Sequence, residues 1–282
     1  MAASSKKGKN QVKGLLWGTV SEVLFLGTGN AFCPPGRMHA LALLDRKILI
    51  DSPPTLLSQL RIAGIYPSDL KHLLFTHWHA DHTFGFPFLL LDRNKMGRID
   101  GKSGPLSVHC RPGGYDVLSK LCRLGFPGNL ENEIEKGVVW DYAESGDLSG
   151  TNWRFERFPV SHTPETDPHG YKLSHKSGFC MVHCGDSGPC QKIEEMAQDS
   201  DVVILEMGVP DFVNSPHHHN PTDVIEFWRR HPEIQILVTH NFSKSPNLNH
   251  GFEIPELPEE IIQLNDGDSL LVKENGSFTV NF

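Results

Sequence analysis

Four side chains able to bind a metal occur within six consecutive residues, in the run His77-Trp78-His79-Ala80-Asp81-His82. Imidazole nitrogens and carboxylate oxygens are ligands that Zn²⁺ selects. The run follows the apolar segment 73–75, which we expect to be a buried strand, so a tight loop would turn several ligands toward one point. The alternatives are a solvated polar loop or a cluster of core histidines. Buried polar groups need hydrogen-bond partners, and the side chains of a core histidine cluster in this run would have only each other as partners. The sequence therefore predicts a metal site.

The segment Thr76–His82 resembles the HxHxDH signature of the metallo-β-lactamase superfamily. This resemblance implies an αββα sandwich with a two-metal site at one edge, and it implies three later ligands that follow strands. The chain has a residue of the right type after a predicted strand in each case, at His162, Asp186 and His240. The resemblance thus extends over nearly the whole chain from about residue 21.

The resemblance also implies how seven ligands divide between two metal ions. The first ion would take His77, His79 and His162, the second would take Asp81, His82 and His240, and Asp186 would bridge them. A bridging hydroxide would be the nucleophile, since divalent ions lower the pKa of bound water toward neutrality, and Asp81 is counted among the catalytic residues as well. We expect Zn²⁺, with Mn²⁺ or Fe²⁺ as alternatives, because His/Asp sites accept several divalent ions. No Ser stands in a GxSxG elbow, so a serine nucleophile is not expected.

An early glycine-containing loop is similar to the ribonuclease Z-like branch of the superfamily. Phe25–Ala31 resembles the opening strand and loop of that branch. The loop would approach a phosphate closely or would form a tight turn that needs glycine freedom. Arg37 follows, either facing an anionic substrate or as a charge on an exposed loop.

A Glu and a His in the second half strengthen the likeness to that branch. Glu206 ends the predicted strand 202–205, and His219 precedes the predicted helix 222–230. In that branch such a pair donates a proton to the leaving group, and a His oriented by a carboxylate suits this role because its pKa lies near neutral pH. The alternatives are a helix cap or loop ion pair for Glu206 and a surface position for His219. His217 and His218 receive no role.

The chain also departs from the ribonuclease Z pattern. Asp51–Leu57 replaces a Gly-Glu-Gly-Thr-Gln segment of the true enzymes, and no long Gly/Pro-rich arm is present. The net charge of −8 argues against a surface that grips many phosphates. We therefore expect a phosphodiesterase acting on a small molecule or a short phosphodiester, without extensive nucleic-acid binding. The rivals are a lactonase, β-lactamase or thioesterase on the same fold, or a non-catalytic metal-binding or RNA-associating protein.

The elements that must position these residues are short and mixed in type. We expect strands at 23–26, 41–44, 48–50, 73–75, 106–109, 153–158, 179–183, 202–205, 236–238, 270–272 and 278–280, and helices at 53–63, 84–91, 115–124, 191–197 and 222–230. Strands and helices do not alternate strictly. This favours an α/β (α+β) protein with two mixed sheets packed face to face and helices outside.

The organisation predicted along the chain is simple. Residues 1–18 have the composition of a flexible tail, and 19–282 would form one metallo-β-lactamase-fold domain. The six cysteines form no CxxC pair, which indicates free thiols in a reducing compartment. No apolar run approaches the ~20 residues that span a bilayer, so we expect a cytoplasmic protein with no membrane partner. A homodimer is common in the resembling family. Segments 92–104 and 163–169 are the expected walls of the substrate site.

Overall fold

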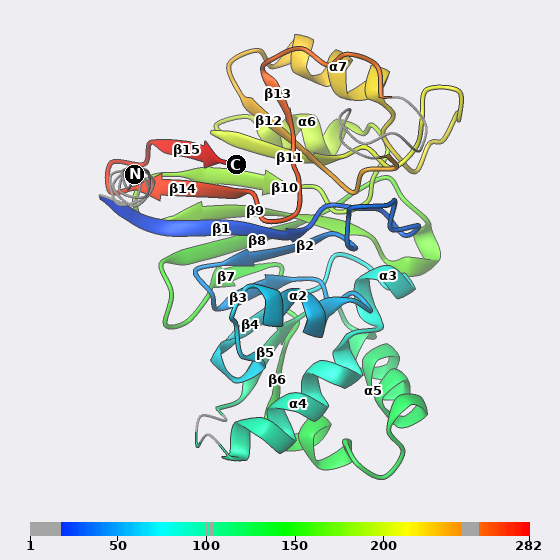
Figure 1. Ribbon diagram of the computed structural model, residues 1–282, viewed down its shortest axis with the longest axis vertical. Coiled ribbons are helices and arrows are strands. Elements are labelled where there is room, and N and C mark those ends of the chain that lie inside the picture. The colour runs from blue at the N-terminus through cyan, green and yellow to red at the C-terminus, as the bar shows by residue number, and fades with distance from the viewer. Residues whose placement is uncertain (1–17, 100, 102–103, 244–253) are drawn as a thin grey trace, which may run out of the picture.

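Two β-sheets lie face to face, and helices cover both outer faces (Figure 1). The computed structural model describes residues 18–99, 101, 104–243 and 254–282. The predicted αββα sandwich is confirmed. The predicted tail lies, apart from Gly18, outside the described residues.

The first sheet contains eight strands and positions the predicted ligands of the run His77–His82. In spatial order they are β15 (Phe278–Asn281), β14 (Ser269–Lys273), β1 (Thr19–Gly27), β2 (Leu41–Leu44), β3 (Ile48–Ile50), β4 (His72–Leu74), β5 (Leu106–His109) and β6 (Val138–Asp141). Strands β3 to β6 pair in parallel. Because the carboxyl ends of parallel strands meet at one edge, the loops that follow β3 and β4 lie together.

The second sheet contains seven strands and supplies the later ligands. In order they are β13 (Ile261–Gln263), β12 (Gln235–Thr239), β11 (Val202–Glu206), β10 (Cys180–His183), β9 (His169–His175), β8 (Trp153–Pro159) and β7 (Ser145–Asp147). Strands β10 to β13 pair in parallel, so their carboxyl ends also share one edge. Between the sheets lies an apolar layer that includes Phe25, Trp153 and Phe155.

The helices divide between the outer faces, as Figure 1 shows. They are α2 (Leu56–Ile62), α3 (Ala80–Thr83), α4 (Phe86–Ile99), α5 (Gly114–Gly125), α6 (Gln191–Ala197) and α7 (Pro221–Arg230), with short turns at Pro67–Asp69, Glu133–Gly137 and Pro164–Thr166. Residues of α2, α4 and α5 share a core with the first sheet, and residues of α6 and α7 share one with the second. Helix α7 begins with a capping box between Asn220 and Asp223, which satisfies free backbone donors.

Most predicted elements are present, with instructive exceptions. Strand β9 was not expected, because its alternation of His, Tyr, Lys and Ser carries little apolar signal although most of it is buried. Helix α4 continues to Ile99 rather than ending near Leu91. Buried Arg93 donates hydrogen bonds to the carbonyls of Pro67 and Leu70, and Figure 1 shows this end of α4 far from α3. The prediction that 92–104 walls the site is therefore wrong for the described residues of that segment.

The structure also bears on the cysteines and on membrane-spanning helices. All six cysteines are unpaired. In the described part of the chain, none of the helices combines the length and the apolar character that a bilayer crossing requires.

Candidate metal centre

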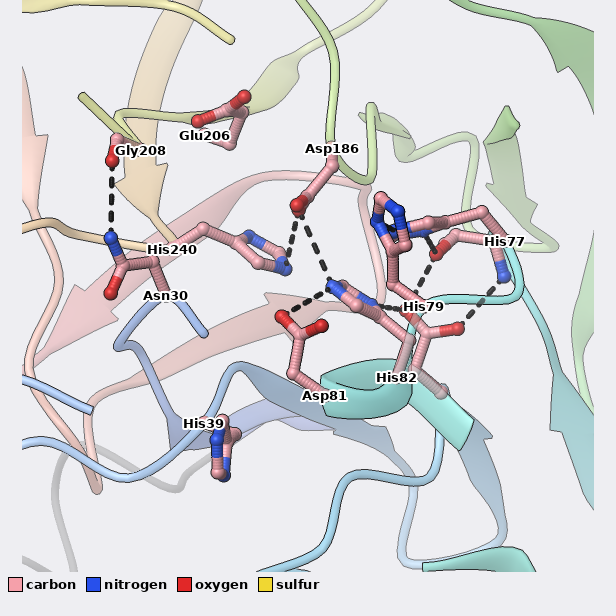
Figure 2. Close-up of polar contacts among 12 residues, drawn as sticks. Asn30, His39, His77, His79, Asp81, His82, Asp186, Glu206, Gly208 and His240 are labelled. Atoms are coloured by element: carbon pink, nitrogen blue, oxygen red, sulfur yellow. Dashed lines mark hydrogen bonds and ion pairs between the residues drawn. The ribbon is translucent and has the colours of Figure 1, made fainter. Parts of the chain in front are cut away.

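All seven predicted ligands come together at the edge where the strand ends of both sheets meet. The first four follow β4 in a loop that becomes helix α3, and the others follow β8, β10 and β12. Figure 2 shows Asp186 between His240 and His82, with Asp81 and His79 nearby. Residues more than 160 positions apart in the sequence thus share one small volume.

Three histidine nitrogens converge on a single point. His79 Nδ1 lies 3.0 Å from His77 Nε2 and 3.0 Å from His162 Nε2. One ring nitrogen cannot form good hydrogen bonds to both neighbours at once. A tetrahedral Zn²⁺ with ligands at about 2.1 Å would place its ligand nitrogens about 3.4 Å apart. The spacing therefore fits a shared cation with little movement.

Two carboxylates and two further histidines form the neighbouring group. His82 Nε2 lies 3.3 Å from Asp81 Oδ2 and 3.5 Å from Asp186 Oδ1, and His240 Nε2 lies 3.4 Å from the same Asp186 oxygen. His82 Nε2, His240 Nε2 and Asp186 Oδ1 are buried without a hydrogen-bond partner among the described residues. Buried polar atoms that face one another without partners are what a metal site leaves when the ion is absent.

Hydrogen bonds around three of the ligands fix which ring nitrogen is free to bind. The Thr76 hydroxyl donates to Asp51 at 2.7 Å, so it accepts from His77 Nδ1 at 3.1 Å and leaves His77 Nε2 with a lone pair. His82 Nδ1 donates to Asp51 Oδ2 at 2.8 Å. His162 Nδ1 donates to the carbonyl of His217 at 2.9 Å. In each case Nε2 faces the ligand group, as in carboxylate–histidine–metal arrangements.

The electrostatics of the site also suit cations. Burial lowers the pKa of His77 well below its usual value and that of His162 to about 4, so both rings are neutral and able to coordinate. Burial alone would lower the pKa of His82, but the carboxylates of Asp81, Asp186 and Asp51 raise it well above the usual value. This pocket therefore favours a positive charge, which a metal ion supplies without protonating the ring. The donor set fits divalent metals.

His240 has an unusual backbone conformation, which the hydrogen bonds of the next residue, Asn241, stabilise. His240 has φ of 47°, the left-handed region that non-glycine residues rarely occupy. Fully buried Asn241 fixes it, because its backbone N–H and its side-chain amide both donate to the Thr28 carbonyl, at 2.7 and 2.9 Å. Gln263 donates to Asn241 Oδ1 at 3.0 Å. These contacts turn the imidazole toward Asp186.

Glu206 pairs with a different histidine from the one that we predicted. Its carboxylate lies 2.7 Å from His218 Nδ1, whereas His219 is buried and its Nδ1 lies 2.5 Å from the Ser187 carbonyl. The correction has a simple cause: the chain turns at residues 216–218, so His218 and His219 point in different directions and only His218 faces the ligand group. Burial lowers the pKa of His219 to about 4.

The His218–Glu206 pair adjoins the ligands. A ring nitrogen of His218, one of His162 and an oxygen of Asp186 lie within 4.8 Å of one another. Burial raises the pKa of Glu206 to about 7. Burial would lower the pKa of His218, but the hydrogen bond and charge of Glu206 raise it to about 9. The pair can therefore hold a proton beside the metal centre.

Gly27 and Arg37 serve packing, which corrects the expectation that the glycine loop needs glycine freedom for a tight turn and both alternatives for Arg37. A Cβ at Gly27 would lie 2.1 Å from the His39 carbonyl, so this glycine permits close approach of two backbone segments and its φ is not positive. Arg37 is buried, and its guanidinium donates to the Thr28 hydroxyl and to the carbonyls of Leu264 and Ser243. It faces neither substrate nor solvent.

Two functional positions were missed from the sequence. Asp51, 2% exposed, accepts from Thr76 and His82. Its place directly after β3, which neighbours β4, was an available signal. His218 carried no distinguishing signal within its run of three histidines. Of the expected walls, 163–169 adjoins the ligands, since Thr166 accepts from the Trp78 backbone at 3.2 Å.

Comparisons with known proteins establish the family. The model of the Beta-lactamase superfamily domain matches residues 46–241. The chain therefore belongs to this superfamily, as its HxHxDH run predicted, and it is a metal-dependent hydrolase by class.

Individual relatives are distant but cover most of the chain. Ribonuclease Z of Pyrococcus abyssi is 22% identical over 78% of this chain and 85% of its own length. Among solved structures, the metallo-β-lactamase fold protein YhfI of Bacillus subtilis aligns with a TM-score of 0.72 at 14% identity, covering 89% of this chain and 99% of its own. The short form of human tRNase Z aligns with a TM-score of 0.63 at 19% identity, covering 88% and 98%. The likeness to ribonuclease Z in sequence is confirmed, and the solved structures agree in fold.

Proposed function

We propose that this protein is a phosphodiesterase that works with two divalent metal ions. The observation that carries the proposal is the His218–Glu206 pair beside the seven-ligand group, because a leaving alkoxide needs a proton at that place. The name of the curated relatives, ribonuclease Z, supports the same bond type. The ligand set alone would serve carbonyl hydrolysis equally well.

The donor geometry supports the division of ligands that the family resemblance implies. His77, His79 and His162 would hold one ion, Asp81, His82 and His240 the other, and Asp186 both. Bound divalent ions supply Lewis acidity and lower the pKa of water, which provides a nucleophile near neutral pH. Zn²⁺ suits these nitrogen and carboxylate donors, with Mn²⁺ or Fe²⁺ as alternatives.

The chain's own contribution to bond cleavage lies with His218. Its Nδ1 faces Glu206 Oε1, so the proton for the departing oxygen would come from Nε2. Glu206 holds the ring in one orientation and keeps it protonated, while the Ser187 backbone N–H donates to Glu206 at 3.3 Å and fixes the carboxylate. His218 acts on the leaving group, and Glu206 positions it.

We propose a short phosphodiester as the substrate. The net charge of −8 supports contacts that are limited to the metal centre. The expectation against extensive nucleic-acid binding is partly at odds with relatives that are named ribonucleases, so a short oligonucleotide belongs among the substrates to be tried. The site opens at a sheet edge, where loops rather than strands determine substrate shape.

The test uses bis-p-nitrophenyl phosphate with metal-reconstituted enzyme. We expect metal-dependent cleavage of this ester, whose p-nitrophenolate leaves without a proton. The role of His218 is tested on a dinucleotide, whose leaving alkoxide needs a proton, and there kcat should fall about 10²-fold or more in His218→Ala. His217→Ala is the matched control, because it keeps the backbone carbonyl that orients His162 and should retain activity. His219→Ala should lower stability more than kcat. Turnover of lactones, β-lactams or thioesters far above that of any phosphodiester would overturn the proposal.

A further inference from the structure

A tight turn at the rim of the metal centre presents one aromatic side chain. The backbone N–H of Cys33 donates to the Asn30 carbonyl at 3.0 Å, and that of Phe32 donates to Asn30 Oδ1 at 3.1 Å. Cys33 has φ of 45°. The Asn30 side chain thus closes the turn in the manner of an Asx-turn, and Phe32 stands at its tip.

The turn is tied to the catalytic edge on two sides. Asn30 Nδ2 donates to the Gly208 carbonyl at 3.1 Å, two residues after Glu206, and the Asn30 backbone N–H donates to the Asn241 carbonyl at 3.2 Å, one residue after His240. Figure 2 shows Asn30 beside His240 and joined to Gly208. The position of Phe32 is therefore fixed relative to the metal centre rather than left to a free loop.

The exposure of Phe32 has no structural explanation in the turn itself. Its side chain is 87% exposed, whereas Phe25 and Phe75 are 1% and 0% exposed in the core. Ser, Asp or Gly would serve such a turn without exposing apolar surface. On the loop after Gly208, Phe212 is also 73% exposed. Two loops joined by the Asn30–Gly208 hydrogen bond thus each carry an exposed phenylalanine.

We propose that Phe32 is a specificity-determining residue whose ring stacks on the nucleobase of a nucleotide phosphodiester bound at the metal centre. This inference rests on the proposed phosphodiesterase function and names its substrate class. Base–aromatic stacking tolerates any base, because every base has a π-face, and it needs few charged contacts. It therefore suits a protein whose net charge is −8. Stacking acts on substrate binding, so Phe32 should affect KM and not the proton transfer by His218.

The experiment compares two substrates that share a leaving group and differ in the nucleoside. These are thymidine 5′-(p-nitrophenyl phosphate) and methyl p-nitrophenyl phosphate. In Phe32→Ala, KM for the thymidine ester should rise about tenfold with kcat nearly unchanged, while both parameters for the methyl ester stay as in the wild type. Phe32→Trp should restore the low KM. Phe282→Ala is the matched control, since Phe282 is 78% exposed at the last residue of the chain, and Figure 1 shows the C end far from helix α3, which carries Asp81 and His82.

The outcomes separate this inference from the function on which it rests. Equal effects of Phe32→Ala on both esters, or no effect on either, would overturn base stacking and leave the phosphodiesterase standing. If the metal-loaded wild type cleaves neither ester, the proposed function fails and the stacking role falls with it. A loss of kcat rather than a rise in KM would assign Phe32 to the fold of the turn and also contradict the proposal.

Discussion

Two groups of buried histidines occupy this sandwich, and their hydrogen bonds differ. In the first sheet, His72 Nδ1 lies 3.0 Å from His109 Nε2, His72 Nε2 lies 3.0 Å from the Ser149 carbonyl, and His109 Nδ1 lies 3.0 Å from Asp141 Oδ2. Each ring nitrogen of this inner pair faces a different protein group. At the metal centre, Nε2 of His82 and both ring nitrogens of His240 lack a hydrogen-bond partner among the described residues.

The difference shows how a structural histidine is distinguished from a ligand. Both groups are buried and both include carboxylates, so burial and composition do not separate them. In the inner pair, His72 and His109 contact each other, and the contacts run on to the Ser149 carbonyl and the Asp141 carboxylate, so that within the described part of the chain only His109 Nδ1 lacks a hydrogen bond of good geometry. Ring nitrogens that point at one another from several elements form a group that could hold an ion. The following predictions test whether this distinction holds.

Loss of the shared carboxylate should have the largest effect. Asp186→Ala removes the group that faces both His82 and His240, so we expect less than one metal per chain and a fall in kcat/KM of more than about 10³-fold. Metal content after reconstitution and phosphodiester turnover measure this. His109→Gln, in the inner pair, should retain metal. Equal metal loss in the two variants would contradict the comparison.

Removing the support of one ligand should have a smaller effect. Asp51→Asn weakens the acceptor that orients His82 and Thr76, and we expect metal affinity to fall about 10- to 100-fold. Competition with a chromogenic chelator gives the affinity. The matched variant is Asp141→Asn, which changes the carboxylate beside His109. An affinity change of similar size in Asp141→Asn would mean that the inner pair also serves the metals.

His109, in the inner pair with His72, should make a smaller contribution, which appears in how the free energy of unfolding depends on pH. Burial and the neighbouring His72 lower the pKa of His109 to about 4, against about 6.5 in the unfolded chain. The unfolded state therefore binds the proton more tightly, and the stability that depends on neutral His109 is present above pH 6.5 and is lost as the pH falls toward 4.

Between pH 7 and 5.5 this group should account for about 1 kcal/mol of lost unfolding free energy. Urea unfolding of the metal-free protein at both pH values, in wild type and His109→Gln, measures the difference. The variant should show the shallower pH dependence. Identical slopes would show that His109 does not titrate in this range.

The fold and the grouping of the seven predicted ligands were largely readable from the sequence, whereas the residues that support this group were not. Four predicted ligands lie within one short run, and the resemblance that this run carries implied the other three, each after a predicted strand. Asp51 acquires its role because β3 and β4 pair in parallel, which is a long-range property. The choice between His218 and His219 depends on how the chain turns at residues 216–218, which the local residue types do not determine.

The centre joins the two sheets of the sandwich. His77, His79, Asp81 and His82 follow the first sheet, while His162, Asp186 and His240 follow the second. Bound ions would therefore act as cross-links that close loops of about 80 residues and more, comparable to disulfides in their effect on the unfolded chain. Metal content would then contribute to the stability of the sandwich, and chelation would lower its free energy of unfolding.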